Sequence, residues 1–400
     1  MANEIGCPKE ILTHPLESRL AYFSKITIAH PLLIEAYEKL RRAILEPAGS
    51  TLIFVIGPTG VGKTTLQQRI KQKLDQEIKP LLDADPGRLP IVSVEAVGPD
   101  SGNWSWKDFY KRILSAMDEP LIEHKVDPER WSNNRNGGAY FHLNPGVVAA
   151  DLRRAVEQAL LNRRPPAVLI DEAQHIAKVA SGRRMQDQWD CVKSLANMTK
   201  TVHVFFGSYE LVNFCNLSGQ LSRRSIDIHF RRYCADSKED ILAFQQVLWT
   251  FEKLLPLREK YVLTQPEESE FIKEWKYFYE RSMGCVGILK DWLYRALADV
   301  LEKRKETLTL RDLKKHAYSL SKCLKIASDA IEGETRLKEN ESDQLKLLQM
   351  LRLEQNNEAT GNRQLTRNES SNQARSGIRK LRVGEPKPNR YPSGIKSHAD

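Results

Sequence analysis

The chain has 400 residues, of which 41% are apolar and 28% charged, the composition of a globular protein with room for two or three domains. No apolar run reaches about 18 residues and the N-terminal segment lacks a basic-then-apolar pattern, so we expect neither a transmembrane helix nor a secretory signal. Six scattered cysteines without a C-x-x-C pair argue against a zinc site and a disulfide framework, and favour a reducing cytoplasm.

The net charge of +9 and the pI of about 9.1 point to a polyanionic partner. Residues 361–400 hold nine Lys or Arg against three Asp or Glu, so this tail carries two thirds of the excess charge. A nucleic-acid interface on the folded part would therefore need a local basic patch.

Residues 1–50 form a predicted N-terminal helical segment, because apolar residues recur at helical spacing within residues 31–45. Strands are then predicted at residues 51–57, 88–97, 165–174, 201–210 and 225–233, with helices at 64–82, 104–117, 151–164 and 186–200 between them. This alternation predicts an α/β core over residues 51–235 with a mainly parallel sheet. Residues 118–145 are rich in Asn, Gly and Pro and read as an inserted loop.

Residues 236–330 change to a helical pattern, which predicts a separate helical domain. Residues 331–360 are compatible with one more amphipathic helix. Residues 361–400 are polar and basic, so we expect a disordered tail. Its role is open among a DNA arm, a segment that folds on a partner protein, and a solubilising extension.

The run G-P-T-G-V-G-K-T follows a predicted strand and opens a predicted helix, the context of a phosphate-binding loop. Its glycines let backbone N–H groups face phosphates, Lys63 reaches the β- and γ-phosphates, and Thr64 supplies a hydroxyl to Mg²⁺. The predicted nucleotide-binding residues here are Gly57, Pro58, Thr59, Gly60, Val61, Gly62, Lys63, Thr64 and Thr65.

The run A-V-L-I-D-E-A-Q ends a second apolar strand with two carboxylates. Asp171 is placed to order magnesium together with Thr64. Glu172 is placed to orient and deprotonate an attacking water. Such a pair is typical of ATP hydrolases and distinguishes them from kinases.

Three further positions are candidates in this machinery. Ser208 follows an apolar strand and would present a hydroxyl to the γ-phosphate or to water; an ordinary strand-end serine is the alternative. Arg223 and Arg224 precede a strand and could act on a neighbouring subunit's γ-phosphate, Arg223 ahead of Arg224; a solvated or DNA-bound pair is the alternative. Lys290, three residues after Gly287, is a candidate γ-phosphate contact in the helical domain or simply a surface lysine.

The motifs G-P-T-G-V-G-K-T-T, L-I-D-E-A-Q-H-I, F-F-G-S-Y-E-L and Q-L-S-R-R come in this order before a predicted helical lid. Over about residues 25–325 the chain thus resembles the AAA+ ATPases, and more narrowly the TnsC/TniB group of transposition regulators, including those of CRISPR-associated transposons. Lys290 stands where many AAA+ proteins have arginine.

The resemblance implies a five-stranded AAA+ sheet with a C-terminal helical lid and ATP as the nucleotide. It implies an ATPase that forms rings or filaments around duplex DNA and disassembles on hydrolysis. It also implies a bacterial cytoplasmic protein that links a TniQ/TnsD-like target selector to a transposase.

In ring-forming AAA+ proteins the segment after the second strand faces the central channel. Lys107, Lys111 and Arg112 are therefore candidate contacts to the DNA backbone, with a solvated helix face as the alternative. Arg183 and Arg184 are a second candidate pair. Two other functions stay open: a helicase loader or origin-recognition-type ATPase, which a winged-helix domain after the lid would favour, and a signalling NTPase that binds only proteins.

Overall fold

The structure is a computed structural model, and it describes residues 6–98, 104–125, 148–177, 182–215, 223–258, 266–338 and 341–353. Two compact units divide the chain, Met1–Lys338 and Glu339–Asp400. The predicted tail over residues 361–400 and most of the predicted insertion at 118–145 lie outside the described residues. Among the residues that are described, no helix is both long and apolar enough to cross a membrane.

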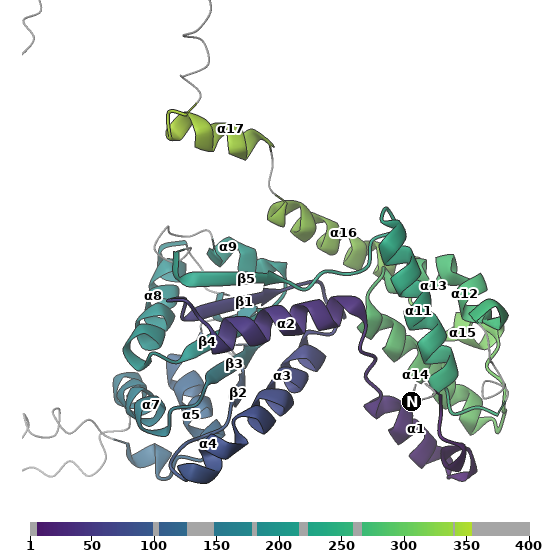
Figure 1. The fold of residues 1–400 in the computed structure, drawn as a ribbon, viewed down its shortest axis with the longest axis horizontal. Helices are drawn as coiled ribbons and strands as arrows, with labels where there is room; N and C mark the ends of the chain where they lie inside the picture. The colour runs from purple at the N-terminus through teal and green to yellow at the C-terminus, as the bar shows by residue number, and fades with distance from the viewer. Residues whose placement is uncertain are drawn as a thin grey trace, which may run out of the picture. The chain divides into compact units, whose positions relative to one another are not determined.

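The first unit is built on one sheet of five parallel strands in the order β2-β3-β4-β1-β5 (Figure 1). The strands are β1 (Leu52–Ile56), β2 (Val92–Glu95), β3 (Ala167–Asp171), β4 (Val202–Gly207) and β5 (Ser225–His229). The predicted five-stranded parallel sheet is thus confirmed, and all carboxyl ends of its strands lie at one edge.

Both faces of the sheet are buried, which explains why its central strands are apolar throughout. Residues Ile53 and Val55 of β1 belong to one apolar cluster, whereas Leu52, Phe54 and Ile56 belong to the other. Helices α2 (Pro31–Leu45) and α3 (Lys63–Glu77) contribute to the first cluster. On the opposite face lie α5 (Trp106–Ala116), α7 (Ala149–Arg163), α8 (Gly182–Thr199) and α9 (Val212–Cys215).

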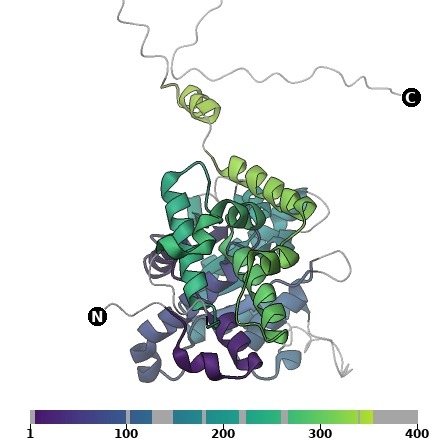
Figure 2. The same ribbon diagram turned by 90° about the vertical axis from the view of Figure 1, so that its right-hand side faces the viewer.

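A helical lid follows the sheet. Its helices are α11 (Lys238–Leu254), α12 (Glu270–Lys273), α13 (Trp275–Ser282), α14 (Val286–Glu302) and α15 (Leu310–His316), and they face the viewer in Figure 2. Helix α1 (Leu16–Lys25) packs against α14. The apolar cluster that includes α2 and α3 continues into the lid through Phe251, Trp292 and Leu297, so lid and sheet share one core.

Helix α16 (Leu320–Leu337) begins against the lid and ends against the α/β core. Near its start it contacts α13, and near its end it contacts the turn η5 (Tyr209–Leu211) that follows β4. Gly333 permits the close approach at that end, because a Cβ there would lie 2.0 Å from Cγ of Tyr209. In the second unit, α17 (Glu341–Met350) is helical.

Two predicted helices are each divided in the structure. The helix expected at 64–82 ends at Glu77, and α4 (Lys79–Ala84) starts anew with Pro80 in its first turn, where a missing N–H costs nothing. Within the predicted helical domain, the sequence R-D-L-K-K-H-A-Y-S-L-S-K-C-L reads as one helix over residues 311–324, but the structure interrupts it at residues 317–319, and Ser319 caps α16 by accepting a hydrogen bond from Lys322 N at 3.4 Å.

Candidate nucleotide site

The phosphate-binding loop, residues 57–64, connects the carboxyl end of β1 to the first turn of α3. Gly62 caps α3 with φ +115°, a left-handed conformation that a residue with a Cβ adopts only at a cost. The loop thus leads directly into the N-terminus of α3. The first N–H groups of that helix lack helical partners and carry partial positive charge, so they can bind anions such as phosphates.

Lys63 folds back onto its own loop. Its Nζ donates hydrogen bonds to the carbonyl oxygens of Gly57 and Pro58, both at 2.9 Å. Burial lowers the pKa of Lys63, and the nearby carboxylates of Glu172 and Asp171 oppose that shift. An ammonium that is hydrogen-bonded to two loop carbonyls and lies near two carboxylates is prepared to bind phosphate oxygens.

Thr64 and Asp171 meet at the carboxyl edge of the sheet. The Thr64 hydroxyl donates to Oδ2 of Asp171 at 3.1 Å. Burial raises the pKa of the Asp171 carboxyl, while the N–H of Glu172 and the Thr64 hydroxyl lower it. Two hard oxygen donors this close fit Mg²⁺, which takes its remaining ligands from phosphates and water. No cluster of three or more His, Cys, Asp or Glu side chains that could hold a metal ion occurs in the described part of the chain.

Glu172 lies at the start of the turn after β3 in a left-handed conformation, with φ +51°. Its N–H donates to Oδ1 of Asp171 at 2.9 Å. The carboxylate accepts a hydrogen bond from Nε2 of Gln174, and Oε1 of Gln174 accepts the N–H of Ser208 at 3.3 Å. The carboxamide of Gln174 thus connects the ends of the neighbouring strands β3 and β4.

Ser208 occupies the predicted position directly after β4, and its Oγ caps η5 by accepting the N–H of Glu210 at 3.4 Å. Its hydroxyl proton is not used in that contact, so the residue keeps a donor for a phosphate or a water. A catalytic role for Ser208 stays a prediction.

The lid touches the phosphate-binding loop directly. The N–H of Ile288 in α14 donates to the carbonyl oxygen of Gly60 at 3.2 Å. Gly287 is needed for this approach, because a Cβ there would lie 2.5 Å from the same oxygen. The phosphate-binding loop and α14 are therefore in direct contact, with no residue between them.

Beside this contact lies a small hollow between the loop, the lid and the segment before α2. Its lining includes Ile28, His30, Val61, Thr65 and Lys290. Lys290 Nζ donates to the carbonyl oxygen of Ser24 at 2.7 Å, so in this structure it holds the end of α1. Its predicted γ-phosphate contact stays a prediction, although it borders the same hollow as the loop.

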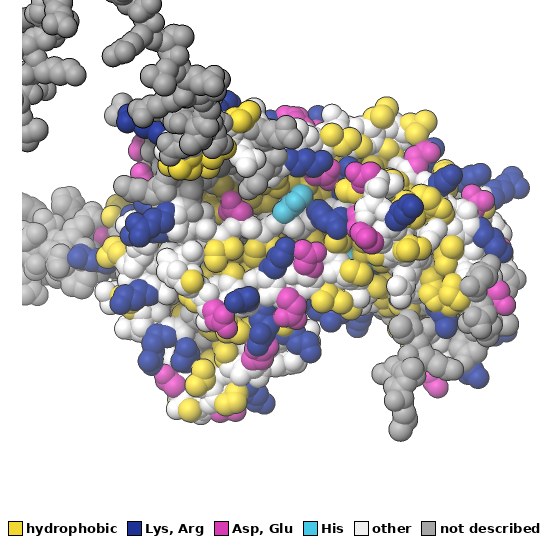
Figure 3. Space-filling view, turned by 45° about the horizontal axis from the view of Figure 1, so that its top comes forward, with side chains coloured by type: hydrophobic (Ala, Val, Ile, Leu, Met, Phe, Trp, Pro, Cys, Tyr) yellow, Lys and Arg dark blue, Asp and Glu magenta, His cyan; other side chains and the backbone are white. Residues whose placement is uncertain are grey.

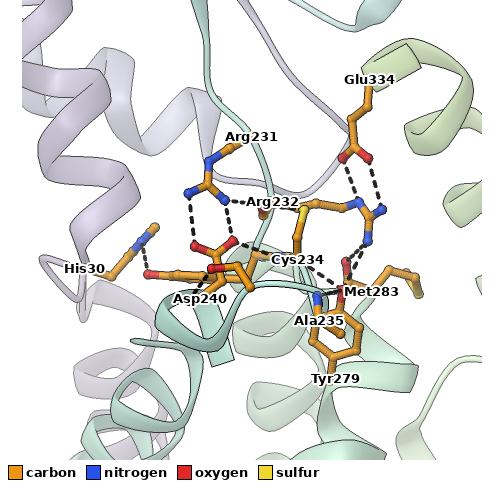
Figure 4. Close-up of polar contacts among 11 residues, drawn as sticks. His30, Arg231, Arg232, Cys234, Ala235, Asp240, Tyr279, Met283 and Glu334 are labelled. Atoms are coloured by element: carbon orange, nitrogen blue, oxygen red, sulfur yellow. Dashed lines mark hydrogen bonds and ion pairs between the residues drawn. The ribbon is translucent and has the colours of Figure 1, made fainter. Parts of the chain in front are cut away.

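The linker from β5 to α11 is fixed by two arginines (Figure 4). Arg231 forms a bidentate ion pair with Asp240. The Asp240 carboxylate also accepts a hydrogen bond from the backbone N–H of Cys234 in the linker at 2.8 Å. Arg232 pairs with Glu334 of α16 at 2.8 Å and donates to the carbonyl oxygen of Met283 at 3.1 Å. Sheet, lid and α16 therefore meet at this linker.

Arg223 and Arg224 are exposed and stand just before β5. Ser225 of β5 is in register with Leu52, the first residue of β1, so the pair lies at the amino edge of the sheet. The phosphate-binding loop lies at the carboxyl edge of the same sheet. Four residues of strand separate the two edges, roughly 13 Å at 3.3 Å per residue, so neither arginine is positioned to reach the loop of its own chain.

The candidate DNA contacts on α5 are largely engaged within the chain. Lys111 pairs with Glu123 at 2.6 Å, and Arg112 pairs with Asp108 at 2.6 Å. Lys107 is exposed. Arg183 and Arg184 lie in α8, but their side chains are outside the described part of the structure. On the face drawn in Figure 3, Lys and Arg side chains are interspersed with Asp and Glu.

Sequence reasoning did not single out Gln174, Arg232 or the segment lining the hollow. Gln174 appeared only as the last letter of L-I-D-E-A-Q, and its spacing from Glu172 was the available signal. Arg232 and Glu334 are about one hundred residues apart in the chain, and no local pattern pairs them.

Comparison with known protein families finds a match to the family described as "AAA domain" over residues 47–214. A comparison with curated proteins finds no match. Among solved structures, the ORC2 protein of Aeropyrum pernix (ADPNP-ADP complexes) is 14% identical with a TM-score of 0.46, over 75% of this chain and 71% of that one.

Two other structures are similar at the same level. One is Drosophila ORC bound to DNA, with 11% identity, a TM-score of 0.42, and coverage of 79% of this chain and 68% of that chain. The other is a Walker-type ATPase of Pyrococcus abyssi, with 16% identity, a TM-score of 0.41, and coverage of 80% and 75%. At these identities and TM-scores, the likenesses do not bear on function.

The family match spans β1, the phosphate-binding loop, β3 and β4, the elements that carry Lys63, Thr64, Asp171 and Glu172. The chain thus contains an AAA domain at residues 47–214 and has an AAA+ P-loop fold, with a parallel five-stranded sheet and C-terminal helices.

Proposed function

We propose that this protein is an AAA+ ATPase that uses ATP as a switch for assembly on duplex DNA. The observation that carries the enzymatic part is the convergence of Lys63, the Thr64–Asp171 pair and Glu172 at one sheet edge, beneath a lid that contacts the same loop.

In the proposed reaction Glu172 accepts a proton from a water molecule whose oxygen attacks the γ-phosphorus. The bond between the γ-phosphorus and the β,γ-bridging oxygen breaks, and ADP and inorganic phosphate leave. Lys63 exchanges the carbonyls of Gly57 and Pro58 for β- and γ-phosphate oxygens. Thr64 and Asp171 would hold Mg²⁺, which supplies positive charge against the phosphates.

Two variants test this assignment. Lys63→Ala should abolish binding of a fluorescent ATP analogue, because the loop then lacks the ammonium that meets the β- and γ-phosphates. Glu172→Gln should keep binding but lose at least about 100-fold in kcat, the usual contribution of a general base. Lys73→Ala, an exposed lysine on the same helix, is the matched control. Normal hydrolysis by Glu172→Gln would refute the proposed chemistry.

We extend the proposal to an oligomer in which Arg223 acts on the nucleotide of a neighbouring subunit. Its position at the sheet edge opposite its own loop supports a role between subunits. A mixing experiment tests this. Arg223→Ala and Lys63→Ala should each be inactive alone. When the two variants are mixed, part of the ATPase activity should return at interfaces where the intact loop of an Arg223→Ala subunit meets the intact Arg223 of a Lys63→Ala subunit. No recovery in co-assembled oligomers would contradict it, and Arg224→Ala serves as the neighbouring control.

The finer assignment is regulation of transposition, in which the ATP-bound oligomer links a TniQ/TnsD-like target selector to a transposase. Its support is the order of motifs that resembles the TnsC/TniB group. Helix-only structure after the lid in the described residues also favours it over a helicase loader with a winged-helix domain, since no described strand follows β5.

Electron microscopy with a non-hydrolysable ATP analogue, with and without duplex DNA, tests the assembly. Rings or filaments that need both ligands support the proposal, whereas monomers under all conditions refute it. Lys107→Ala should weaken DNA binding. It should also reduce the slope of log affinity against log salt concentration by about one, the contribution of one phosphate contact. Because Lys111 is held by Glu123, Glu123→Gln should strengthen binding if this face meets DNA.

A further inference from the structure

We propose that Gln174 is a positioning residue for hydrolysis, holding the Glu172 carboxylate at a fixed place relative to the end of β4. The inference rests on the proposed ATPase function and adds to it a residue that does not itself touch the substrate.

Both polar atoms of the Gln174 carboxamide form hydrogen bonds. Its Nε2 donates to Oε2 of Glu172, and its Oε1 accepts the N–H of Ser208 at 3.3 Å. A carboxylate only accepts and an N–H only donates, so a flipped carboxamide would lose both contacts. The group therefore has one satisfied orientation, and that orientation sets where the Glu172 carboxylate lies.

The end of β4 is shaped around this side chain. A Cβ at Gly207 would lie 2.6 Å from Oε1 of Gln174, so only glycine leaves room for the carboxamide in its present position. Gln174 is half-buried. A side chain fitted this closely between two strand ends loses little entropy on each turnover, which is what positioning requires.

The main chain of Glu172 is fixed, but its carboxylate is not held by the main chain. Asp171 accepts its N–H, and its carbonyl accepts the N–H of His175 at 3.0 Å. The residue has φ +51°, a strained conformation of the kind that persists at functional sites. The charges of Glu172 and Asp171 both oppose the burial that lowers the pKa of Lys63, so the carboxylate that Gln174 holds lies near the ammonium of the phosphate-binding loop.

The test compares substitutions that separate the two contacts. Gln174→Met keeps the length of the side chain and removes both hydrogen bonds. Gln174→Glu keeps the acceptor for Ser208 and replaces the donor to Glu172 with a second carboxylate. We expect both to lose about 10- to 100-fold in kcat, with KM and analogue affinity within about twofold of wild type. Gln72→Met, an exposed position on α3, is the control.

A structural role predicts a different pattern. If Gln174 only supports the end of β4, Gln174→Glu keeps wild-type kcat, and the proposal is overturned. Loss of analogue binding in Gln174→Met, or wild-type kcat in that variant, overturns it as well.

A double-mutant cycle with Glu172→Gln separates this inference from the proposed function. If Gln174 acts through Glu172, adding Gln174→Met to Glu172→Gln should lower kcat by less than about twofold further. A full additive loss would overturn the positioning role while leaving Glu172 as the base. Full activity of Glu172→Gln alone would instead overturn the proposed chemistry itself.

Discussion

The ion pair between Arg232 and Glu334 should determine whether α16 stays attached to the α/β core. Both side chains are nearly buried, 12% and 14% exposed, and their two hydrogen bonds measure 2.8 and 3.1 Å (Figure 4). Removing one partner of a buried pair costs about 3–5 kcal/mol, because the other charge is left without compensation. Arg232→Met should therefore weaken the attachment of α16 by about 3 kcal/mol at the lower bound.

The measurement is hydrogen exchange of the amides in the C-terminal half of α16. Since 1.4 kcal/mol corresponds to a factor of ten, a loss of about 3 kcal/mol should speed local opening and exchange by roughly 100-fold. Lys325→Met in the same helix is the matched control, because its pair with Asp329 is 78% and 61% exposed. Exposed pairs contribute less than about 1 kcal/mol, so its effect should stay below about fivefold.

The double variant Arg232→Met with Glu334→Met completes the test. It removes both charges, so most of the lost protection should return, apart from the contribution of the Arg232 bond to Met283. Exchange in Arg232→Met that changes less than about threefold would refute the reasoning. A double variant no more protected than Arg232→Met would show that burial of the unpaired charge is not the cause.

Three other predictions follow from the same structure. Gly287→Ala should weaken ATP-analogue binding several-fold and lower the melting temperature, since its Cβ would lie 2.5 Å from a loop carbonyl; Gly6→Ala, with open space around it, should do neither. Burial lowers the pKa of His30 and of His203 to about 4 in the folded protein, whereas a histidine in the unfolded chain has a pKa of about 6.5. Between pH 6.5 and 4 the unfolded chain therefore binds more protons than the folded one, and the free energy of unfolding measured in urea should fall as the pH drops. His203→Phe should remove part of that slope, and a pH-independent urea midpoint would contradict it. Burial raises the pKa of the Cys285 thiol to about 12, so alkylation of Cys285 at pH 8 should be slow until denaturant is added, and rapid labelling of Cys285 in the native protein, located by peptide mass spectrometry, would contradict its burial.

Much of the fold was predictable because the pattern of each segment is local. The limits of α2 match the predicted helix at 31–45, and each predicted strand contains a strand of the sheet. Continuous apolar runs indicate strands buried on both faces, and those strands pair in parallel. The division of the predicted helix at Ile78 was missed because the helical spacing of apolar residues continues across Pro80. Proline lacks the N–H that a continuing helix needs, so α3 ends before Pro80 and a new helix begins there.

The candidate site was predictable to the extent that its chemistry lies in contiguous motifs. Thr64 and Asp171 come from two motifs that were paired in advance, and the structure brings them to 3.1 Å. The candidate DNA contacts on α5 were chosen by their charge and by the expected place of their segment in a ring. Their partners Asp108 and Glu123 are within reach only once α5 and the turn after it are folded.

The sequence by itself determined the phosphate-binding loop, the acidic pair and the alternation of strands and helices, because each depends on residues a few positions apart. Tertiary structure alone decided that Gln174 joins Glu172 to the end of β4, and that Ile288 of the lid meets Gly60. It likewise decided that Arg232 finds Glu334 in α16. These contacts join segments far apart in the chain or depend on the exact approach of neighbouring strands, and no periodicity along the sequence encodes a distance between them.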